Sequence, residues 1–256
     1  MSGAIVEARG LSYTYPDGTV ALEEVSFSVA PGEAVALVGP SGAGKSTLLH
    51  CLIWLLQPQK GEVLIAGRQV SKKTLKDVRA QVGLIFQNPD DQLFMPTLYD
   101  DVAFGPLNRG IEGEELDKRV RKAIADRGLA GMEDKFPGHL SGGQKRLASL
   151  AAVLVLEPAV LLLDEPSTNL DPKSRRQLIR QLDALDSARI IASHDLEMAL
   201  DLCARAILLD RGRLVAEGDP AKLLADAALM EARGLEVPHS LQPHRHQHVP
   251  RSHRDG

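Results

Sequence analysis

The sequence predicts an α/β fold in which helices cover a parallel β-sheet. In the second half of the chain, short apolar strands alternate with helical segments, an order typical of parallel strands joined by crossover helices. In the first half, a buried strand at residues 34–38 leads into a glycine-rich loop and then a helix. With 256 residues, 44% of them hydrophobic, the chain can bury a core that is large enough to fold alone.

The N-terminal third is expected to consist of short strands and turns. Apolar or alternating segments predict strands at residues 4–9, 24–29 and 34–38. The segments Pro16-Asp17-Gly18 and Pro31-Gly32-Glu33 predict the turns between them. A helix should then run from Lys45 to Leu56, because the composition favours a helix and Pro58 stops it.

Residues 88–158 are predicted to form a mainly helical insert. The segment QNPDDQLFMPTLYDDVAFGP (87–106) is acidic and interrupted by three prolines, so a loop is expected there. The charged segment 112–129 has apolar residues at helical spacing, and a second helix is predicted from Ser141 to about Leu156.

Strands return after the insert and alternate with helices. Strands are predicted at 160–164, 189–193 and 205–209, and helices at 172–185 and 195–203. The main domain is expected to occupy residues 1–235, followed by a flexible tail at 236–256. The tail lacks apolar periodicity and holds five of the eight histidines.

The histidine spacing in this tail leaves two interpretations open. His244, His246 and His248 alternate with other residues, and neutral imidazoles could gather round Co²⁺, Ni²⁺ or Zn²⁺. The simpler alternative is a solvated tail without a ligand, or a remnant of cloning.

Composition and charge exclude several classes of protein. A net charge of −4 and a pI near 6.1 argue against a protein that coats nucleic acid. Cys51 and Cys203 are too few for a disulfide framework, which indicates a reducing cytoplasm, and the N-terminus has no secretory pattern. The most apolar region, 147–163, is broken by Glu157-Pro158, so no run reaches the roughly 18 residues of a membrane span. If the protein works at a membrane, another polypeptide is expected to cross it.

The glycine-rich loop predicts a phosphate-binding site. It fits the pattern G-x-x-x-x-G-K-[ST], with Gly39, Pro40, Ser41, Gly42, Ala43, Gly44, Lys45, Ser46 and then Thr47. Such a loop points backbone N–H groups at phosphate oxygens, and the following helix adds its positive N-terminal end. Lys45 should reach the β- and γ-phosphates, and Ser46 should ligate Mg²⁺. The alternative is a turn that is merely rich in small residues.

Two carboxylates follow the buried strand VLLLD. Alone, Asp164 and Glu165 could simply be surface charges that end a strand. Beside a phosphate loop, Asp164 is expected to hold Mg²⁺ and Glu165 to orient and deprotonate the attacking water. The pair therefore predicts hydrolysis in addition to binding.

Three further motifs stand in order with these. LSGGQ (140–144) begins the predicted helix of the insert, Gln87 precedes the acidic loop, and His194 follows a strand. Together the five motifs resemble the ATP-binding-cassette (ABC) ATPase family over roughly residues 3–230. The resemblance implies a RecA-like core with an N-terminal antiparallel β-subdomain and a helical insert. It also implies ATP and Mg²⁺ as cofactors and ATP hydrolysis as the reaction.

The resemblance assigns roles to single residues. Tyr15 would stack on adenine, although it could also be a core tyrosine at a strand end. Gln87 would sense the γ-phosphate, Mg²⁺ and the attacking water, and His194 would contact the γ-phosphate. Both residue types are more often only polar or structural when they stand alone.

The family also implies a head-to-tail dimer that ATP holds together. Ser141, Gly142, Gly143 and Gln144 of one copy would contact the nucleotide held by Lys45 of the other, because a helix N-terminus favours anions. Asp171 would lie in the loop that links the two sites, or would cap a helix before Pro172, and both roles are compatible. A homodimer is expected, with a heterodimer as the alternative.

The sequence QNPDDQLFMPTLYDDVAFGPLNRG resembles the ATPase subunit of energy-coupling-factor importers, particularly the cobalt and nickel systems. This implies a transmembrane scaffold subunit and a substrate-binding membrane subunit as partners, no nucleic acid, and a peripheral place on the cytoplasmic face of the cell (inner) membrane. The acidic loop is expected to dock onto basic residues of a membrane subunit, or else to be a solvated loop. Cobalt is the expected substrate; the alternatives are nickel, a vitamin, or a soluble ABC ATPase outside transport.

Overall fold

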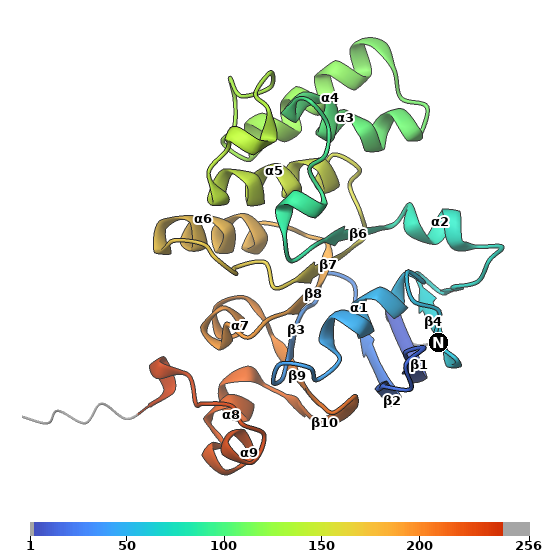
Figure 1. The fold of residues 1–256 in the computed structure, drawn as a ribbon, viewed down its shortest axis with the longest axis vertical. Helices are drawn as coiled ribbons and strands as arrows, with labels where there is room; N and C mark the ends of the chain where they lie inside the picture. The colour runs from blue at the N-terminus through green and yellow to red at the C-terminus, as the bar shows by residue number, and fades with distance from the viewer. Residues whose placement is uncertain (1–2, 243–256) are drawn as a thin grey trace, which may run out of the picture.

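The computed structural model describes residues 3–242 and contains two β-sheets and a layer of helices (Figure 1). The larger sheet has the strand order β10-β9-β3-β8-β7-β6. Its strands are β3 (Ala34–Val38), β6 (Val82–Ile85), β7 (Val160–Asp164), β8 (Ala188–Ala192), β9 (Arg205–Asp210) and β10 (Arg213–Gly218). All pair in parallel except the edge strand β10, which is antiparallel to β9. The predicted parallel sheet is confirmed.

The central strands are buried on both faces, which explains their continuous apolar sequences. In β3, Ala34, Ala36 and Val38 pack toward the helical insert, whereas Val35 and Leu37 pack toward the second sheet. The carboxyl ends of these parallel strands meet at one edge of the sheet, where ligands bind in open α/β sheets.

The second sheet is antiparallel, with the order β2-β1-β4-β5. Its strands are β1 (Val6–Thr14), β2 (Val20–Val29), β4 (Lys60–Ile65) and β5 (Arg68–Gln69). The first two are longer than predicted, because shifts in their pairing register let the strands continue through irregular positions. The expected antiparallel β-subdomain is present.

Helix α1 (Lys45–Leu52) follows the glycine-rich loop and is buried among residues of both sheets. It ends four residues before the predicted Leu56, where Trp54 adopts a left-handed conformation (φ 53°) that a helix cannot contain. Helices α2 (Leu75–Arg79), α6 (Pro172–Asp183) and α7 (Leu196–Leu202) complete the core. Helix α2 was not predicted from the sequence.

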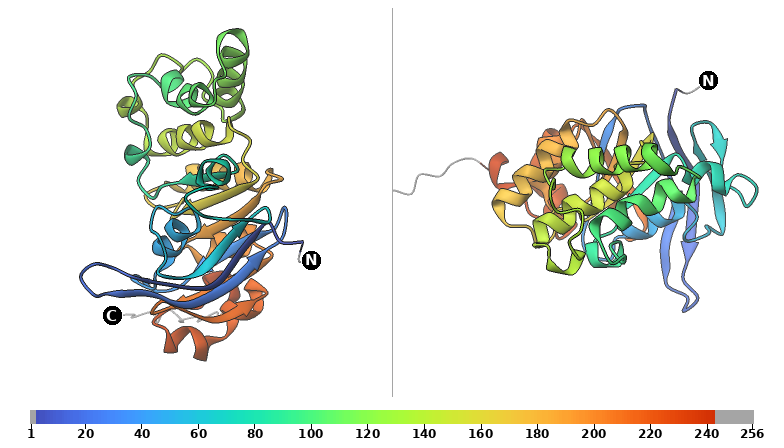
Figure 2. Two further views of the ribbon diagram at one scale, coloured as in Figure 1. Left: turned by 90° about the vertical axis from the view of Figure 1, so that its right-hand side faces the viewer. Right: turned by 90° about the horizontal axis from the view of Figure 1, so that it is seen from above.

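The insert contains α3 (Leu98–Asn108), α4 (Gly113–Asp126) and α5 (Gly142–Leu154), which lie together at one end of the molecule (Figures 1 and 2). The expectation that 87–106 is a loop was wrong for its last nine residues, which belong to α3. The Thr97 hydroxyl accepts a hydrogen bond from the backbone N–H of Asp100 (3.1 Å) and so caps the helix. Pro106 is tolerated close to the end of α3, in a helix that begins eight residues earlier.

Helices α8 (Pro220–Ala225) and α9 (Ala227–Ala232) lie at the end opposite the insert. The domain continues past the predicted boundary at 235, because Pro238 is buried and the Ser240 hydroxyl donates to Glu197 (2.6 Å). The rest of the predicted tail, with His244, His246 and His248, lies outside the described residues. None of the helices within 3–242 combines the length and apolar character needed to cross a bilayer.

Candidate functional site

The glycine-rich loop connects β3 to α1 at the carboxyl edge of the main sheet. Gly39 packs so closely against β9 that a Cβ at this position would overlap the carbonyl oxygen of Leu209. The buried Lys45 donates from Nζ to the carbonyl oxygens of Gly39 (2.8 Å) and Pro40 (3.0 Å), so its ammonium lies within the loop. Burial lowers the pKa of Lys45, while Glu165 and Asp164 act in the opposite direction.

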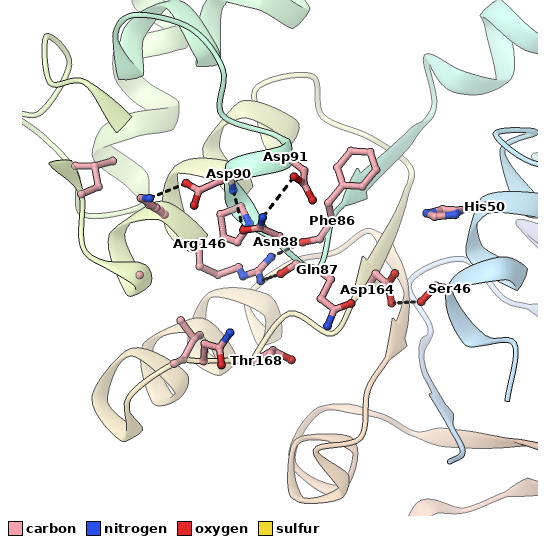
Figure 3. A pocket seen from close by; sticks show the side chains of 16 residues that line it. Ser46, His50, Phe86, Gln87, Asn88, Asp90, Asp91, Arg146, Asp164 and Thr168 are labelled. Atoms are coloured by element: carbon pink, nitrogen blue, oxygen red, sulfur yellow. Dashed lines mark hydrogen bonds and ion pairs between the residues drawn. The ribbon is translucent and has the colours of Figure 1, made fainter. Parts of the chain in front are cut away.

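Ser46 and Asp164 come from different elements and meet at the start of α1. The Ser46 hydroxyl donates to Oδ1 of Asp164 (3.0 Å), as the dashed line in Figure 3 shows. Asp164 is only 5% exposed, and burial raises its pKa. A hydroxyl and a carboxylate are hard oxygen donors, the type that Mg²⁺ prefers, so these residues fit this cation.

Glu165 is held at the end of β7 by the loop that follows β8. Its Oε2 lies 2.6 Å from Nδ1 of His194 and accepts the backbone N–H of the same residue (3.1 Å). Glu165 has a left-handed backbone (φ 44°), an uncommon conformation for a side chain of this type, and such strain concentrates at functional sites. The His194 side chain is 67% exposed, so its ring can reach a ligand while it remains bound to Glu165.

Lys45, Ser46, Glu165 and His194 line one cavity of about 510 Å³, while Asp164 lines a second cavity beside it. The walls of the first cavity are formed by Tyr15, the phosphate loop, Gln87, Glu165 and His194. The Tyr15 hydroxyl lies 2.9 Å from Oγ1 of Thr47, and its ring meets Tyr13 edge-on. The structure therefore brings together most of the side chains that the sequence analysis selected.

Gln87 lies between this cavity and a second one of about 590 Å³. In Figure 3 its side chain extends toward Asp164, while Arg146 approaches its backbone from the insert. Arg146 of α5 donates to the carbonyl oxygens of Phe86 (2.7 Å) and Gln87 (2.5 Å). Sequence analysis missed Arg146; the only signal was a basic residue two positions after LSGGQ.

Arg146 is unusual because its guanidinium is almost fully buried. The residue is 1% exposed, its Nε has no partner among the described residues, and burial lowers its pKa to about 10. It therefore ties α5 directly to the segment that carries Gln87.

No residue of the LSGGQ segment lines the cavity of Tyr15, Glu165 and His194 in its own chain, but Leu140 and Gly142 line the second cavity together with Ser46. The Ser141 hydroxyl accepts the N–H of Gln144 (3.3 Å), and Gln144 accepts the N–H of Ser141 (2.9 Å). This capping box fixes the N-terminus of α5 and leaves Ser141 exposed.

Asp171 is the N-cap of α6, one of the two roles expected for it. It accepts the N–H groups of Lys173 (2.9 Å) and Ser174 (3.1 Å), and hydrogen bonds led by the one from the Ser174 hydroxyl lower its pKa. One turn later, Arg175 donates to both oxygens of Asp195 (2.6 and 3.0 Å), which joins α6 to the segment of His194.

The sequence model of the ABC transporter family matches residues 22–168, more than half of the chain. The chain belongs to the ABC transporter family of ATP-binding proteins. A model of AAA domains also matches residues 136–201, the part that carries LSGGQ and the Asp164-Glu165 pair.

Individual ABC proteins match over nearly the whole chain. A provisionally described ABC transporter ATP-binding protein of Gloeobacter violaceus is 52% identical, covering 90% of this chain and 96% of the relative. The energy-coupling factor transporter ATP-binding protein EcfA of Methanothermobacter thermautotrophicus is 45% identical, covering 91% and 77%.

Two solved structures have the same fold. One is cbiO1 of Clostridium perfringens, part of the ABC transporter complex cbiONQ, with a TM-score of 0.80, 34% identity and coverage of 90% and 94%. The other is the dimeric ATP-binding cassette MJ0796 in a post-hydrolysis state with ADP and Pi, with a TM-score of 0.76, 28% identity and coverage of 84% and 98%. The chain is thus an ABC ATPase of the energy-coupling-factor type that uses ATP and Mg²⁺.

Proposed function

We propose that this ABC ATPase drives an importer of transition-metal ions, with cobalt as the first candidate and nickel as the second. The observation that carries the proposal is the likeness, over about nine-tenths of the chain, to EcfA and to cbiO1, itself part of a transporter complex. On this proposal the chain is peripheral to the cytoplasmic face of the membrane and acts through a scaffold subunit and a substrate-binding subunit.

The first step is the binding of ATP in the cavity of the phosphate loop. Lys45 and the loop N–H groups would hold the β- and γ-phosphates, and the Tyr15 ring would stack on adenine. Ser46 and Asp164 would hold Mg²⁺, which neutralises phosphate charge when bound. The raised pKa of Asp164 supports this role, since a buried carboxylate without a cation is costly.

Hydrolysis would use the Glu165–His194 pair. Glu165 is positioned to accept a proton from the attacking water, because its carboxylate is already fixed by the N–H of His194. If Nδ1 of His194 donates to Glu165, the other ring nitrogen is free to face the γ-phosphate. Gln87 would change position when the γ-phosphate is cleaved, and its backbone contact with Arg146 would transmit this movement to α5 of the insert.

A second protomer would complete each site. The exposed N-terminus of α5, with Ser141, Gly142, Gly143 and Gln144, provides an anion-binding helix end that its own phosphate-loop cavity does not use. The loop that contains Asp171 would contact both active sites and couple their nucleotide states, while Asp171 still caps α6.

We propose that the docking face is less acidic than the sequence suggests. Asp101 is buried and accepts the N–H groups of Phe94 (3.0 Å) and Met95 (3.1 Å), and Asp90 pairs with Lys145 (2.6 Å). Asp101 is therefore enclosed within the chain, whereas Asp90 stays 60% exposed beside Lys145. Phe94 is 63% exposed and stacks edge-on with the exposed Phe104, so we propose a docking face that is more apolar than acidic.

The proposal is tested by purifying a tagged copy from detergent-solubilised native membranes and identifying the companions by mass spectrometry. Small integral membrane proteins in stoichiometric amount are expected, and uptake of radioactive Co²⁺ and Ni²⁺ by cells with and without the gene would then identify the ion. Companions that are ribosomal or DNA-bound, with no membrane subunit, would contradict an import function while leaving the ATPase in place. A vitamin-binding membrane subunit would contradict the metal substrate alone.

A further inference from the structure

The turn between β9 and β10 packs between the phosphate loop and the antiparallel sheet. Its two residues, Arg211 and Gly212, have positive φ angles of 48° and 75°, as two-residue hairpin turns require. The N–H of Gly212 donates to the carbonyl oxygen of Ala43 in the phosphate loop (3.0 Å). A Cβ at residue 212 would lie 2.6 Å from the carbonyl oxygen of Ala21, so the turn has no space on its other side.

Asp210, the last residue of β9 before this turn, contacts the C-terminal part of the chain. Asp210 accepts a hydrogen bond from Arg233 (2.9 Å), and its side chain is only 11% exposed. The Nε of Arg233 is buried and has no partner among the described residues, while Nη1 donates to Asp210 and the side chain as a whole is 37% exposed.

Packing determines where Arg233 lies. Arg233 is the C-cap of α9, and the preceding Met230 is fully buried in the core. A polar cavity of about 360 Å³ separates α9 from the outer side of the phosphate loop, and Arg233, Arg211 and Ser41 are among the residues that line it. The end of α9 therefore faces the outer side of the phosphate loop across this cavity.

We propose that Arg233 is a positioning residue for nucleotide binding, acting through Asp210 and the Arg211-Gly212 turn on the phosphate loop. Arg233 itself lies outside the cavity of Tyr15, Glu165 and His194, so it does not touch the nucleotide. Because coupling between two sites is reciprocal, nucleotide binding stabilises the docked position of α9 to the same extent. This inference rests on the proposed role of the phosphate loop.

The test measures the Kd of a fluorescent ADP analogue for the full chain. Arg233→Gln is expected to raise this Kd by about fivefold or more, the lower end of typical coupling between sites. Asp210→Asn should have the same effect, and the double variant should bind no more weakly than either single variant, because both remove one contact. Arg233→Lys should restore part of the affinity, since a lysine retains one donor for Asp210.

Arg205→Gln is the matched control. Arg205 lies at the other end of β9 and pairs with Glu33 (2.8 Å), at side-chain exposures of 24% and 20%. Its loss should lower the Tm and leave the Kd unchanged. A Kd for Arg233→Gln within twofold of wild type overturns the proposal, and so does an equal loss of affinity in Arg205→Gln, which would indicate general destabilisation.

Two further observations separate the remaining outcomes. If Arg233→Gln does not fold, hydrogen exchange of the wild-type chain decides: ADP should slow exchange at residues 227–233, and unchanged exchange there overturns the proposal. If the wild-type chain does not bind the ADP analogue at all, the proposed function fails and this inference fails with it. Normal binding by wild type and by Arg233→Gln overturns the inference alone.

Discussion

Glu165 combines three features expected of a catalytic base: it follows a buried strand, its backbone is strained, and its carboxylate is oriented by His194. We expect Glu165→Gln to keep ATP binding and to lower ATP turnover by about 10²-fold or more, the usual contribution of a general base. The variant should also accumulate as an ATP-bound dimer. Phosphate release and size-exclusion chromatography with ATP and Mg²⁺ measure the two effects.

Glu157→Gln is the control for this substitution. Glu157 also follows an apolar segment and has a left-handed backbone (φ 51°), but it is exposed and lies outside both cavities at Gln87. The ATP turnover of the Glu157→Gln variant should equal that of wild type. Normal hydrolysis by Glu165→Gln would exclude Glu165 as the base.

Burial of the ionised Asp164 carboxylate carries a cost that a bound cation would relieve. Burial raises the pKa of Asp164, so the folded chain binds this proton more tightly than the unfolded chain does. Such a group supports folding below the unfolded pKa and loses that contribution as the pH rises through the folded pKa. We therefore expect Asp164→Asn to raise the Tm of the nucleotide-free chain at pH 8 by roughly 2–4 °C, the shift that about 1 kcal/mol produces in a chain of this size.

The pH series and the cation provide the checks on Asp164. In calorimetric scans, the difference between variant and wild type should shrink as the pH falls toward the unfolded pKa of aspartate, about 4, because the raised pKa favours the protonated wild-type carboxyl in the folded chain. Addition of Mg²⁺ and ATP should raise the Tm of wild type more than that of the variant. A variant that is less stable than wild type at every pH would mean that the hydrogen bond with Ser46 outweighs the burial cost.

At the scale of elements, the sequence identified those whose apolar character is continuous. Strands β3 and β7 were predicted with the correct ends, because every residue in them is buried. Helix α3 was missed because Pro106 and the acidic residues suggested a loop, whereas Thr97 caps a helix there and Asp101 is used as a buried acceptor. Such use of a polar side chain depends on tertiary neighbours, which a local pattern does not contain.

The same limit applies to the candidate site. Lys45, Ser46, Asp164 and Glu165 could be selected because they stand next to strand ends and a glycine loop, positions that a parallel sheet brings to one edge. Arg146 could not be selected, because its partners are backbone carbonyls about sixty residues away. Only the packing of α5 on the segment after β6 shows this contact.

Arg146 gives a prediction about how α5 and Gln87 are joined. Arg146→Met should leave the carbonyls of Phe86 and Gln87 without their donor, and a buried unpaired carbonyl costs about 1–3 kcal/mol. Relief from burying a charge offsets part of this cost, so we expect a modest fall in stability. ATP turnover should fall more than ATP affinity if Gln87 acts during hydrolysis, as proposed. Steady-state kinetics and urea unfolding measure both.

Arg109→Met is the matched control for Arg146. Arg109 also joins the insert to the core through two backbone carbonyls, those of Leu156 (3.2 Å) and Ala80 (2.6 Å), but it does not contact Gln87. The Arg109→Met variant should be less stable than wild type, but its ATP turnover should not fall more than its ATP affinity. If both variants lose turnover equally, the effect is a general loosening of the insert.

The whole molecule places its two anion-binding features apart. The phosphate loop lies at the edge of the main sheet, and the N-terminus of α5 lies on the helical insert. Leu140 and Gly142 line the second cavity together with Ser46, whereas Ser141, Gly143 and Gln144 line neither cavity. On the proposed mechanism a single chain would be incomplete for hydrolysis, and two copies arranged head to tail would pair each loop with the α5 terminus of the other. The solved dimeric cassette with ADP and Pi shows that this fold can associate in pairs.

Mixed dimers test this arrangement directly. Ser141→Ala should disable the α5 terminus and Lys45→Ala the phosphate loop, so a homodimer of either variant has no complete site. In a mixed dimer, the loop of the Ser141→Ala chain meets the intact α5 terminus of the Lys45→Ala chain, and one complete site forms. Since random mixing of equal amounts makes half of the dimers mixed, and each has one of its two sites, turnover should rise from near zero toward about a quarter of wild type. A mixture no more active than its components would contradict sites shared between chains, provided that co-purification of two differently tagged variants shows that the chains exchange.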